Sequence, residues 1–313
     1  MTKVILNCDN TLSVHRSDVD DGLTLMYLYA HEEIDLLGVT TTFGNNEHHV
    51  VYANTLQMLK DLNVRDLKVF GGARTVDDLE SEAADFLVDR VNRDPGEVVV
   101  ISTGPLHNLY CAHAKDPTFY EKAKRLIIMG GTKTLVPAGR IPHTKPLIKL
   151  VGRLIGARLD ELNFSCAPHA AYHVLKHGKR ISLLSTQLTF QAWFGESEIE
   201  ALRREHPTLA AYLVPILERF IDDVYAQYLK DRGFFNWDLA TALYLTNPEL
   251  FETRPYHAAL SEANLKRGLI PEDRDGSAHL SRVIDLPTRI LSPRQFNRLF
   301  LEKLGVIAER MGT

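Results

Sequence analysis

The sequence predicts a single α/β domain in which helices cover both faces of a mostly parallel sheet. Two observations lead to this fold class. Short runs rich in Val, Ile and Leu alternate with amphipathic segments from the first residues onward, as they do in repeated β-α-β units. These runs are apolar throughout rather than alternately apolar and polar, which is typical of strands that are buried on both sides.

The first half of the chain follows this alternation closely. The strand-like runs are residues 3–7, 34–43, 67–72, 97–102 and 125–131, and the helical segments between them include 22–33, 50–62 and 106–114. Most of the runs end in a polar or glycine-rich loop. Because ligands of open parallel sheets bind at the carboxyl ends of the strands, these loops are where we expect a site.

The second half begins less regularly. Over about residues 137–159 the alternation loosens into a basic stretch with scattered apolar residues. The predicted elements then resume with a helix at 167–176, a strand at 180–185, helical structure throughout 197–230, a helix at 237–245, strands at 256–260 and 282–286, and a final helix at 293–309. No linker and no internal repeat divides the chain, so residues 1–313 are predicted to be one domain.

Composition excludes several classes of partner. The formal charge is −4 with no block of like charges, which argues against a nucleic-acid surface and against a polybasic membrane patch. No apolar run reaches the length of a membrane span. The widely spaced Cys8, Cys111 and Cys166 suit reduced thiols better than a disulfide framework. We therefore expect a cytoplasmic protein that acts on a small molecule.

Carboxylates gather in one loop near the N-terminus. Asp9 ends the first predicted strand, and Asp18, Asp20 and Asp21 precede or open the next helix. Like charges at such spacing are tolerated when a cation or a shared proton offsets their repulsion, and hard oxygen ligands select calcium or magnesium. Helix capping is an equally good explanation of these residues taken alone, and it also suffices for Asp238 at the start of a late helix.

Several short motifs together resemble those of the inosine-uridine-preferring nucleoside hydrolase family. The family pattern is a strand-end Asp, a paired Asp-Asp that opens a helix, and a Gly-Asn loop after the second strand. The matching segments here, in chain order, are Asp9, Asp20-Asp21, Leu37 to Asn45, Ser102 to Asn108, Ile127 to Gly131, Glu161 to Asn163, and Trp237-Asp238. Each motif is weak by itself, but their order extends over most of the chain.

The resemblance implies a nucleoside hydrolase fold with a Rossmann-like core and a calcium ion. The implied ligands of Ca²⁺ are the side chains of Asp9, Asp21 and Asp238 and the carbonyl of Thr103. The implied reaction is hydrolysis of the N-glycosidic bond of a ribonucleoside by a calcium-activated water, and Asp9 is the expected base. The resemblance also implies a homodimer or homotetramer.

The same resemblance implies a set of residues that hold the sugar. A transition state with oxocarbenium character requires the ribose to be fixed by its hydroxyls. The expected ribose-binding residues are Asp20, Asn45, Glu161 and Asn163, and Met129 is expected to pack against the sugar. From the residues alone, Asn45 fits a turn next to Gly44 equally well, and Glu161 with Asn163 fits a capping pair.

The chain departs from the family pattern at three places. Residues 10–17 lengthen the loop between Asp9 and the Asp pair, which puts the geometry of Asp9 in question. The segment after Ala73 is short and lacks a His-containing loop. Trp237 stands where many relatives have a histidine that protonates the leaving base. An aromatic ring here resembles the purine-preferring branch, where it stacks on the base, so we predict a weak purine preference.

Three histidines near the expected site are alternative proton donors. These are His15, His48 and His49, although exposed surface histidines are the simpler explanation of each.

Two other functions remain open from the sequence. The stretch from Val4 to Thr11 imitates the strand and acidic motif of haloacid dehalogenase phosphatases, but Asn7 stands where that chemistry needs a nucleophilic carboxylate. A nucleoside- or ribose-binding protein that has lost turnover would keep the same pocket, because a fold does not guarantee activity.

Overall fold

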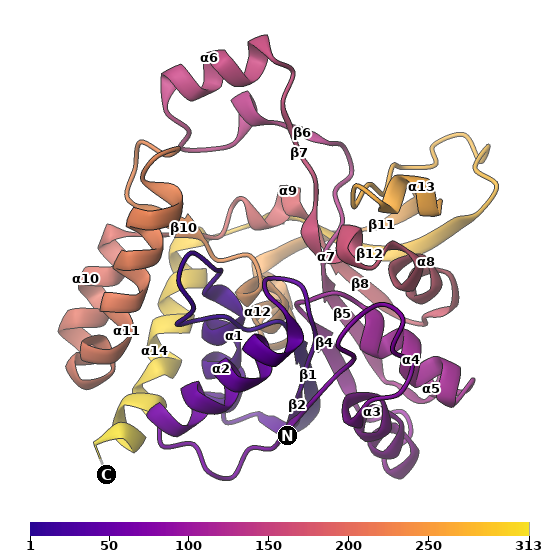
Figure 1. The fold of residues 1–313 in the computed structure, drawn as a ribbon, viewed down its shortest axis with the longest axis horizontal. Coiled ribbons are helices and arrows are strands. Elements are labelled where there is room, and N and C mark those ends of the chain that lie inside the picture. The colour runs from indigo at the N-terminus through magenta and orange to yellow at the C-terminus, as the bar shows by residue number, and fades with distance from the viewer. Residues whose placement is uncertain (313) are drawn as a thin grey trace.

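The computed structural model describes residues 1–312, and its centre is one eight-stranded sheet (Figure 1). The strand order across the sheet is β11-β12-β8-β5-β4-β1-β2-β3. The bounds of these strands, in chain order, are Thr2–Cys8, Ile34–Thr41, Val69–Phe70, Val99–Ser102, Arg125–Met129, Ile181–Leu184, Phe251–Ala259 and Ser281–Ile290 for β1, β2, β3, β4, β5, β8, β11 and β12. Among these strands every neighbouring pair is parallel except β11 and β12, so the predicted mostly parallel sheet is confirmed.

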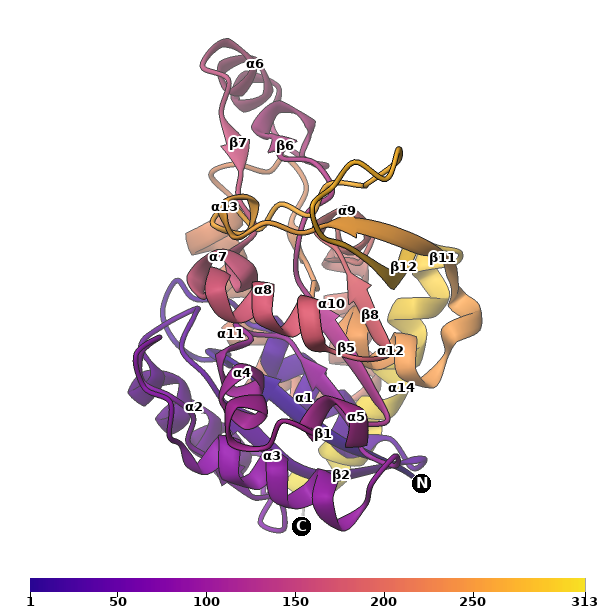
Figure 2. The ribbon, with the colours of Figure 1, turned by 90° about the vertical axis from the view of Figure 1, so that its right-hand side faces the viewer.

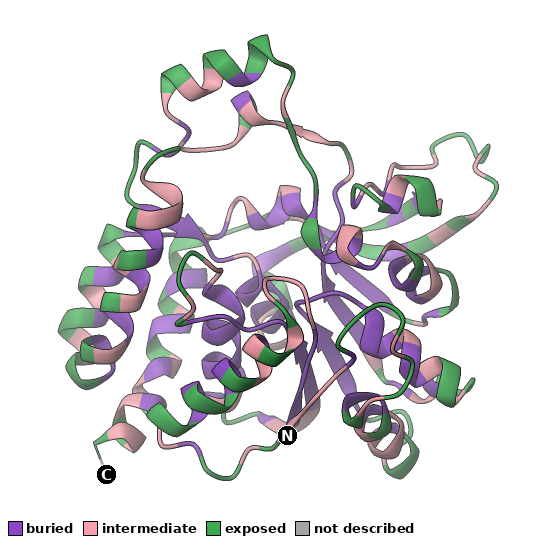
Figure 3. Ribbon diagram, viewed as in Figure 1, coloured by how far each residue is buried: buried purple, intermediate pink, exposed green. Residues whose placement is uncertain are grey.

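Helices cover both faces of this sheet and enclose two apolar cores. One face carries α1 (Asp20–Ala30), α2 (His48–Asp61), α10 (Glu196–Glu205), α11 (Pro207–Phe220), α12 (Leu239–Thr246) and α14 (Pro293–Met311). The other face carries α3 (Glu82–Arg93), α4 (His107–Lys115), α5 (Phe119–Lys122), α7 (Leu162–Cys166) and α8 (Pro168–His177). The central strands β1, β4, β5 and β8 are therefore buried on both sides, which explains their apolar sequences, whereas the edge strands β11 and β12 alternate with exposed residues (Figure 3).

The chain reverses its direction of travel across the sheet at β1. From β1 it moves outward through β2 to β3, and it then returns to the other side of β1 and proceeds through β4, β5 and β8. The loops after β1 and β4 therefore separate at their carboxyl ends and leave a crevice between them. Such a switch point is the preferred binding place in open α/β sheets.

Residues 133–160, which we call the α6 arm, extend beyond one end of the sheet (Figures 1 and 2). The arm contains β6 (Val136–Pro137), the 3₁₀ turn η1 (Ala138–Arg140), α6 (Pro146–Leu154) and β7 (Arg158–Leu159). This is the stretch over which the alternation of the sequence loosens, and it nevertheless contains regular elements. Pro146 opens α6, and apolar residues recur along the helix at the spacing of an α-helical face.

Two further expectations need correction. Residues 197–230 are not helical throughout, because α10 ends at His206 and Pro207 begins a separate helix, α11, which continues as the π-helical turn η2 (Ile221–Tyr225). The last two strands are longer than predicted, since β11 and β12 pair over their whole length as an antiparallel edge. In residues 1–312 no helix is both long and apolar enough to cross a bilayer.

Candidate active site

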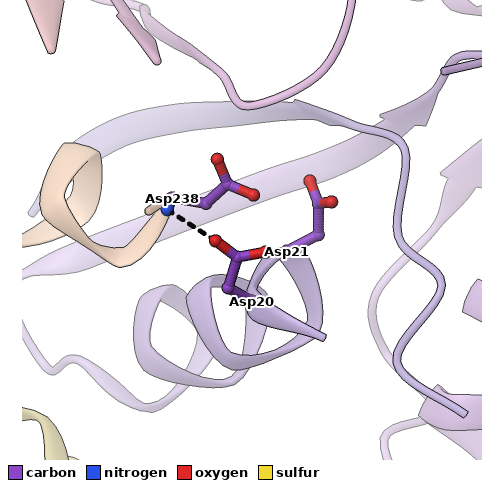
Figure 4. A group of neighbouring side chains, drawn as sticks. All are labelled: Asp20, Asp21 and Asp238. Carbon is purple, nitrogen blue, oxygen red and sulfur yellow. Dashed lines mark hydrogen bonds between the residues drawn. The ribbon is translucent and has the colours of Figure 1, made fainter. Parts of the chain in front are cut away.

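Four aspartates meet at the switch point. Asp9 follows β1, Asp20 and Asp21 open α1, and Asp238 precedes α12; their exposed fractions are 1%, 1%, 1% and 4%. Carboxylate oxygens of Asp20, Asp21 and Asp238 lie within 4.8 Å of one another (Figure 4). The backbone N–H of Asp238 donates to Asp20 Oδ2 at 3.0 Å, which ties the start of α12 to the start of α1.

Asp9 is joined to this group through Asn45. The backbone N–H of Asn45 donates to Asp9 Oδ2 at 2.7 Å, and its side-chain Nδ2 donates to Asp21 Oδ2 at 3.2 Å. From the other side, Thr103 Oγ1 donates to Asp21 Oδ1 at 2.7 Å. Asp9 Oδ1 is buried and has no hydrogen-bond partner. An orphaned buried carboxylate oxygen is costly unless it has a ligand, so this atom points to a missing cation or donor.

Two glycines allow the backbone to approach Asp9 closely. A Cβ placed on Gly44 would lie 2.1 Å from Asp9 Oδ2, and one on Gly104 would lie 2.7 Å from Asp9 Oδ1. Gly44 also has φ of +154°, a conformation that side chains rarely adopt. Any larger residue at either position would push the loops away from the carboxylate.

Burial disfavours the ionised form of these carboxylates. It raises the pKa of Asp9 from 3.8 to about 7 and that of Asp20 to about 6. Burial, and after it the negative charge of neighbouring aspartates, holds the pKa of Asp21 and Asp238 well above the usual range. The positive ends of α1 and α12 offset part of this cost. A hard divalent cation would offset the rest of this cost, since the four aspartates supply carboxylate oxygens as ligands.

The inserted loop does not displace Asp9. Asn54 of α2 donates from Nδ2 to the carbonyl of Asn10 at 3.1 Å and accepts from Ser13 Oγ at 2.6 Å. Arg219 of α11 donates to the carbonyl of Ser13 at 2.8 Å. These bonds hold residues 10–17 against α2 and α11, so the extra length folds away from the carboxylates.

A cavity of about 250 Å³ opens directly over the acidic group. Every residue predicted to bind the ribose or the base lines it, namely Asp20, Asn45, Met129, Glu161, Asn163 and Trp237. Thr103 and Asp238 line it as well. The predicted site residues that line the cavity, which are up to 218 positions apart in the chain, thus surround one space, whereas Asp9 and Asp21 do not line it.

Asn163 fixes the wall opposite α1. Its Nδ2 donates to the carbonyl of Thr103 at 2.8 Å and to the carbonyl of Met129 at 3.1 Å. The Thr103 carbonyl, which the sequence predicted as a metal ligand, therefore already accepts one hydrogen bond. A carbonyl oxygen has a second lone pair, so this bond leaves one position for another partner.

Glu161 has a structural as well as a site-facing position. Its carboxylate accepts from the backbone N–H groups of Asn163 and Phe164, at 2.7 and 3.0 Å, and so caps α7. Burial raises its pKa from 4.5 to about 7. The capping explanation and the lining of the pocket are both correct for this residue.

Trp237 lines the cavity and belongs to an aromatic group. Its ring lies 4.8 Å from that of Phe190 and 5.0 Å from that of Phe235, in tilted to edge-on arrangements. Aromatic packing of this kind holds the indole in place and leaves part of it in the cavity.

None of the three histidines considered as proton donors lines the cavity. His48 Nε2 accepts from the backbone N–H of Gly72 at 3.0 Å, beneath a different surface hollow. His15 and His49 are exposed and pair with Asp223 and Glu47. These histidines are therefore too far from the site to serve the leaving group.

The sequence was compared with models of known protein families. The family model described as inosine-uridine preferring nucleoside hydrolase matches residues 4–290. The chain belongs to this family. Its enzyme class is therefore nucleoside hydrolase, as the motifs predicted, and the match includes the segments that carry all four clustered aspartates.

The relatives of this nucleoside hydrolase differ in the substrates that their names state. The pyrimidine-specific ribonucleoside hydrolase RihA of Shewanella sp. (strain MR-7) is 26% identical, over 87% of this chain and 86% of its own. Among solved structures, the plant nucleoside hydrolase PpNRh1 has a TM-score of 0.80 at 20% identity, with 97% and 98% of the two chains covered. The purine-preferring ribonucleoside hydrolase of Gardnerella vaginalis has a TM-score of 0.78 at 20% identity, with 98% and 99% covered.

The phosphatase alternative does not fit this nucleoside hydrolase. Asn7 is fully buried within the sheet, where it donates to Ser102 Oγ at 2.9 Å and accepts from Thr40 Oγ1 at 3.0 Å and Asn108 Nδ2 at 2.8 Å. It links β1 to β2, β4 and α4 and has no access to a substrate. Its place in the hydrolase is structural.

Sequence reasoning missed some residues that line the cavity. Tyr225, Thr186, Leu159 and Asp160 contribute to its wall, and Asp18 lines it in addition to bonding the N–H of Val19. Tyr225 ends the π-helical turn η2, which the helical pattern of this region does not reveal. Burial raises the pKa of its hydroxyl well above 10, so it is a protonated donor at neutral pH.

Proposed function

We propose that this nucleoside hydrolase is a calcium-dependent enzyme that cleaves the N-glycosidic bond of ribonucleosides and favours purines. One observation carries the proposal: four buried aspartates from three separate segments form one group beside the cavity, Asp20 and Asp238 of this group line it, and Asp9 Oδ1 has no partner. Burying these carboxylates together costs free energy, and a bound cation would offset that cost.

Asp9, Asp21, Asp238 and the carbonyl of Thr103 are the residues that we expect to hold the ion. Calcium, when bound, would orient the ribose hydroxyls and make a water in the site more acidic. Oxygen ligands from carboxylates and a carbonyl are the set that calcium prefers. Magnesium shares this preference for oxygen, so the metal has to be identified by direct measurement.

The residues around the ion supply positioning and proton transfer. Asp9 has a pKa of about 7 without metal and is joined to the acidic group through Asn45, so we expect it to remove a proton from the attacking water near neutral pH. Asp20, Asn45, Glu161 and Asn163 are expected to hold the ribose hydroxyls as positive charge develops on the sugar ring. Met129, buried beside Asn163, is expected to pack against the sugar.

The preference for purines rests on Trp237. A half-buried indole that lines the cavity offers a flat surface on which the base can stack, and the larger ring system of a purine gains more from stacking. The named relatives include pyrimidine-specific and purine-preferring enzymes, so the preference has to be tested on this chain.

We expect purified protein to release free base from ribonucleosides, and a chelator to stop the release. The measurement is free base from inosine, adenosine, guanosine, uridine and cytidine, with and without EDTA, followed by addition of calcium or magnesium. Recovery with calcium alone would support the proposed ion. Tight binding of nucleoside with no release of base under any metal would contradict the proposal and favour a binding protein.

Replacing Trp237 with alanine is expected to lower kcat/KM for inosine by roughly 10- to 100-fold, because one stacked base contributes about 1 to 3 kcal/mol. Uridine should lose less, so the ratio of inosine to uridine activity falls. Trp237→Phe keeps an aromatic surface and serves as the control. An unchanged ratio in Trp237→Ala would show that base preference is set elsewhere.

We also propose that the protein assembles as a homodimer or homotetramer in the cytoplasm. Leu147, Leu150 and Leu154 of α6 are 68%, 55% and 77% exposed, which is unusual for a free surface. Cys8, Cys111 and Cys166 are all unpaired, as in a reducing compartment. Sedimentation equilibrium tests the assembly, and a monomer at all concentrations would contradict it.

A further inference from the structure

A second cavity lies beside the first, beneath the α6 arm. Its volume is about 400 Å³, and its lining is almost wholly apolar. Ile148, Val151 and Ile155 of the arm form one wall at helical spacing. Tyr228, Leu229 and the aromatic group around Trp237 form the opposite wall. No charged side chain of residues 1–312 lines this space, which we call the apolar chamber.

The apolar chamber adjoins the candidate active site. Leu159, Tyr225 and Trp237 line both cavities. Asp20, Asp238 and the expected ribose-holding residues line the first cavity and not the chamber. Trp237 thus stands at the junction, with the carboxylates on one side and the chamber on the other.

The α6 arm is fastened to the body of the protein along one side of the chamber. Thr144 forms an antiparallel bridge with Leu229, the N–H of Lys145 donates to the carbonyl of Tyr228 at 2.9 Å, and the N–H of Lys230 donates to the carbonyl of His143 at 2.8 Å. The ring of His143 also stacks on Trp193 at 3.9 Å. These contacts set the spacing between the two walls, so the chamber is present before any ligand binds.

We propose that the apolar chamber receives a hydrophobic substituent on the nucleobase, so that the preferred substrates are ribonucleosides with an alkyl or aralkyl group on the base. This inference rests on the proposed function. A ribose fixed over the carboxylates directs its base toward Trp237, and the base edge farthest from the glycosidic bond then faces the chamber. In a purine that edge carries the substituent at position 6.

The chemistry of the lining decides which substituents fit. An apolar wall without charged groups gains free energy from each methylene that it takes out of water, and it penalises a charged or strongly polar group that it cannot bond. An unsubstituted base leaves this surface wetted or empty. Discrimination therefore grows with the apolar size of the substituent.

The test compares adenosine, N6-methyladenosine, N6-isopentyladenosine and N6-(carboxymethyl)adenosine as substrates. We expect kcat/KM to rise about tenfold or more from adenosine to the isopentyl compound and to fall for the carboxymethyl compound. Val151→Glu, which places a charge in the chamber wall, should bring the isopentyl-to-adenosine ratio close to 1 with adenosine itself little changed. Arg153→Glu on the same helix does not line the chamber and should keep the wild-type ratio.

Several results would overturn the inference. Equal kcat/KM for adenosine and N6-isopentyladenosine would do so, as would a ratio that Val151→Glu leaves intact. Loss of an oligomer in Val151→Glu with no change in that ratio would assign the chamber to self-association. Should no nucleoside be hydrolysed, the proposed function fails, and the dissociation constants of the same compounds, measured by calorimetry, still test the chamber through the same ratio.

Discussion

Asp21→Asn and Asp238→Asn are each expected to lower kcat/KM for ribonucleosides by on the order of 10³-fold or more. Each substitution removes one charged oxygen ligand from the proposed ion while keeping the size of the side chain. The ion contributes several kcal/mol to the reaction, and each 1.36 kcal/mol is a factor of ten in rate. The measurement is steady-state release of free base at saturating calcium, together with the dissociation constant of calcium for each variant.

Loss of folding is the result to exclude. Because burial and mutual repulsion raise the pKa of both aspartates, removing one charge should leave the metal-free Tm unchanged or higher. Asp222→Asn is the matched control, since Asp222 is exposed and pairs only with Arg232 at the surface. Activity near the wild-type level in either site variant would refute the metal assignment.

Calcium is expected to raise the Tm much more at pH 8 than at pH 5. The pKa values of Asp9 and Asp20 are raised from 3.8 to about 7 and about 6, so the metal-free folded protein keeps protons that the unfolded chain has released. Their contribution to stability is fully present below about pH 3.8 and is lost as the pH rises through 6 to 7. A cation binds the ionised folded form, so it restores stability where those protons have left.

The size of the effect follows from mass action. Calcium at 100 times its dissociation constant contributes about 2.7 kcal/mol, which for a chain of this length corresponds to a rise in Tm of roughly 4 °C at pH 8 and close to none at pH 5. Histidines that titrate in this range, such as His173 with a pKa lowered to about 4, act alike with and without calcium and cancel in the difference. Differential scanning calorimetry at both pH values, with and without calcium, gives the four Tm values.

Asp238→Asn provides the internal control for this experiment. It should remove most of the calcium-induced rise at pH 8, whereas Asp222→Asn should keep it. An equal rise at pH 5 and pH 8, or a full rise in Asp238→Asn, would show that calcium stabilises the protein at some other place.

The apolar periodicity of the chain predicted the sheet well because its strands are buried on both faces. The run at residues 97–102 is mostly apolar and therefore predicts a buried strand. In the structure, β4 occupies Val99–Ser102 of this run. The same run fixes where the strand ends, so it also predicts that Thr103 lies at the carboxyl edge of the sheet. The site could be anticipated to this extent from local pattern and motif order.

The α6 arm could not be anticipated in the same way. Its apolar residues face a chamber whose other wall comes from Tyr228 and Leu229, so their environment depends on a segment about 75 positions away. Leu147 and Leu154 remain exposed, which blurs the contrast between an inner and an outer face. A local window therefore shows scattered apolar residues and no clear period.

Sequence by itself determined the fold class, the family and the identity of the acidic residues, because strand burial and short motifs are properties of neighbouring residues. Only the tertiary structure decided that Asp9 keeps its place despite the inserted loop, that Glu161 caps a helix while it faces the cavity, and that an apolar chamber adjoins Trp237. Each of these depends on contacts between segments far apart in the chain, and the free energy of such contacts is set by burial and distance rather than by order along the sequence.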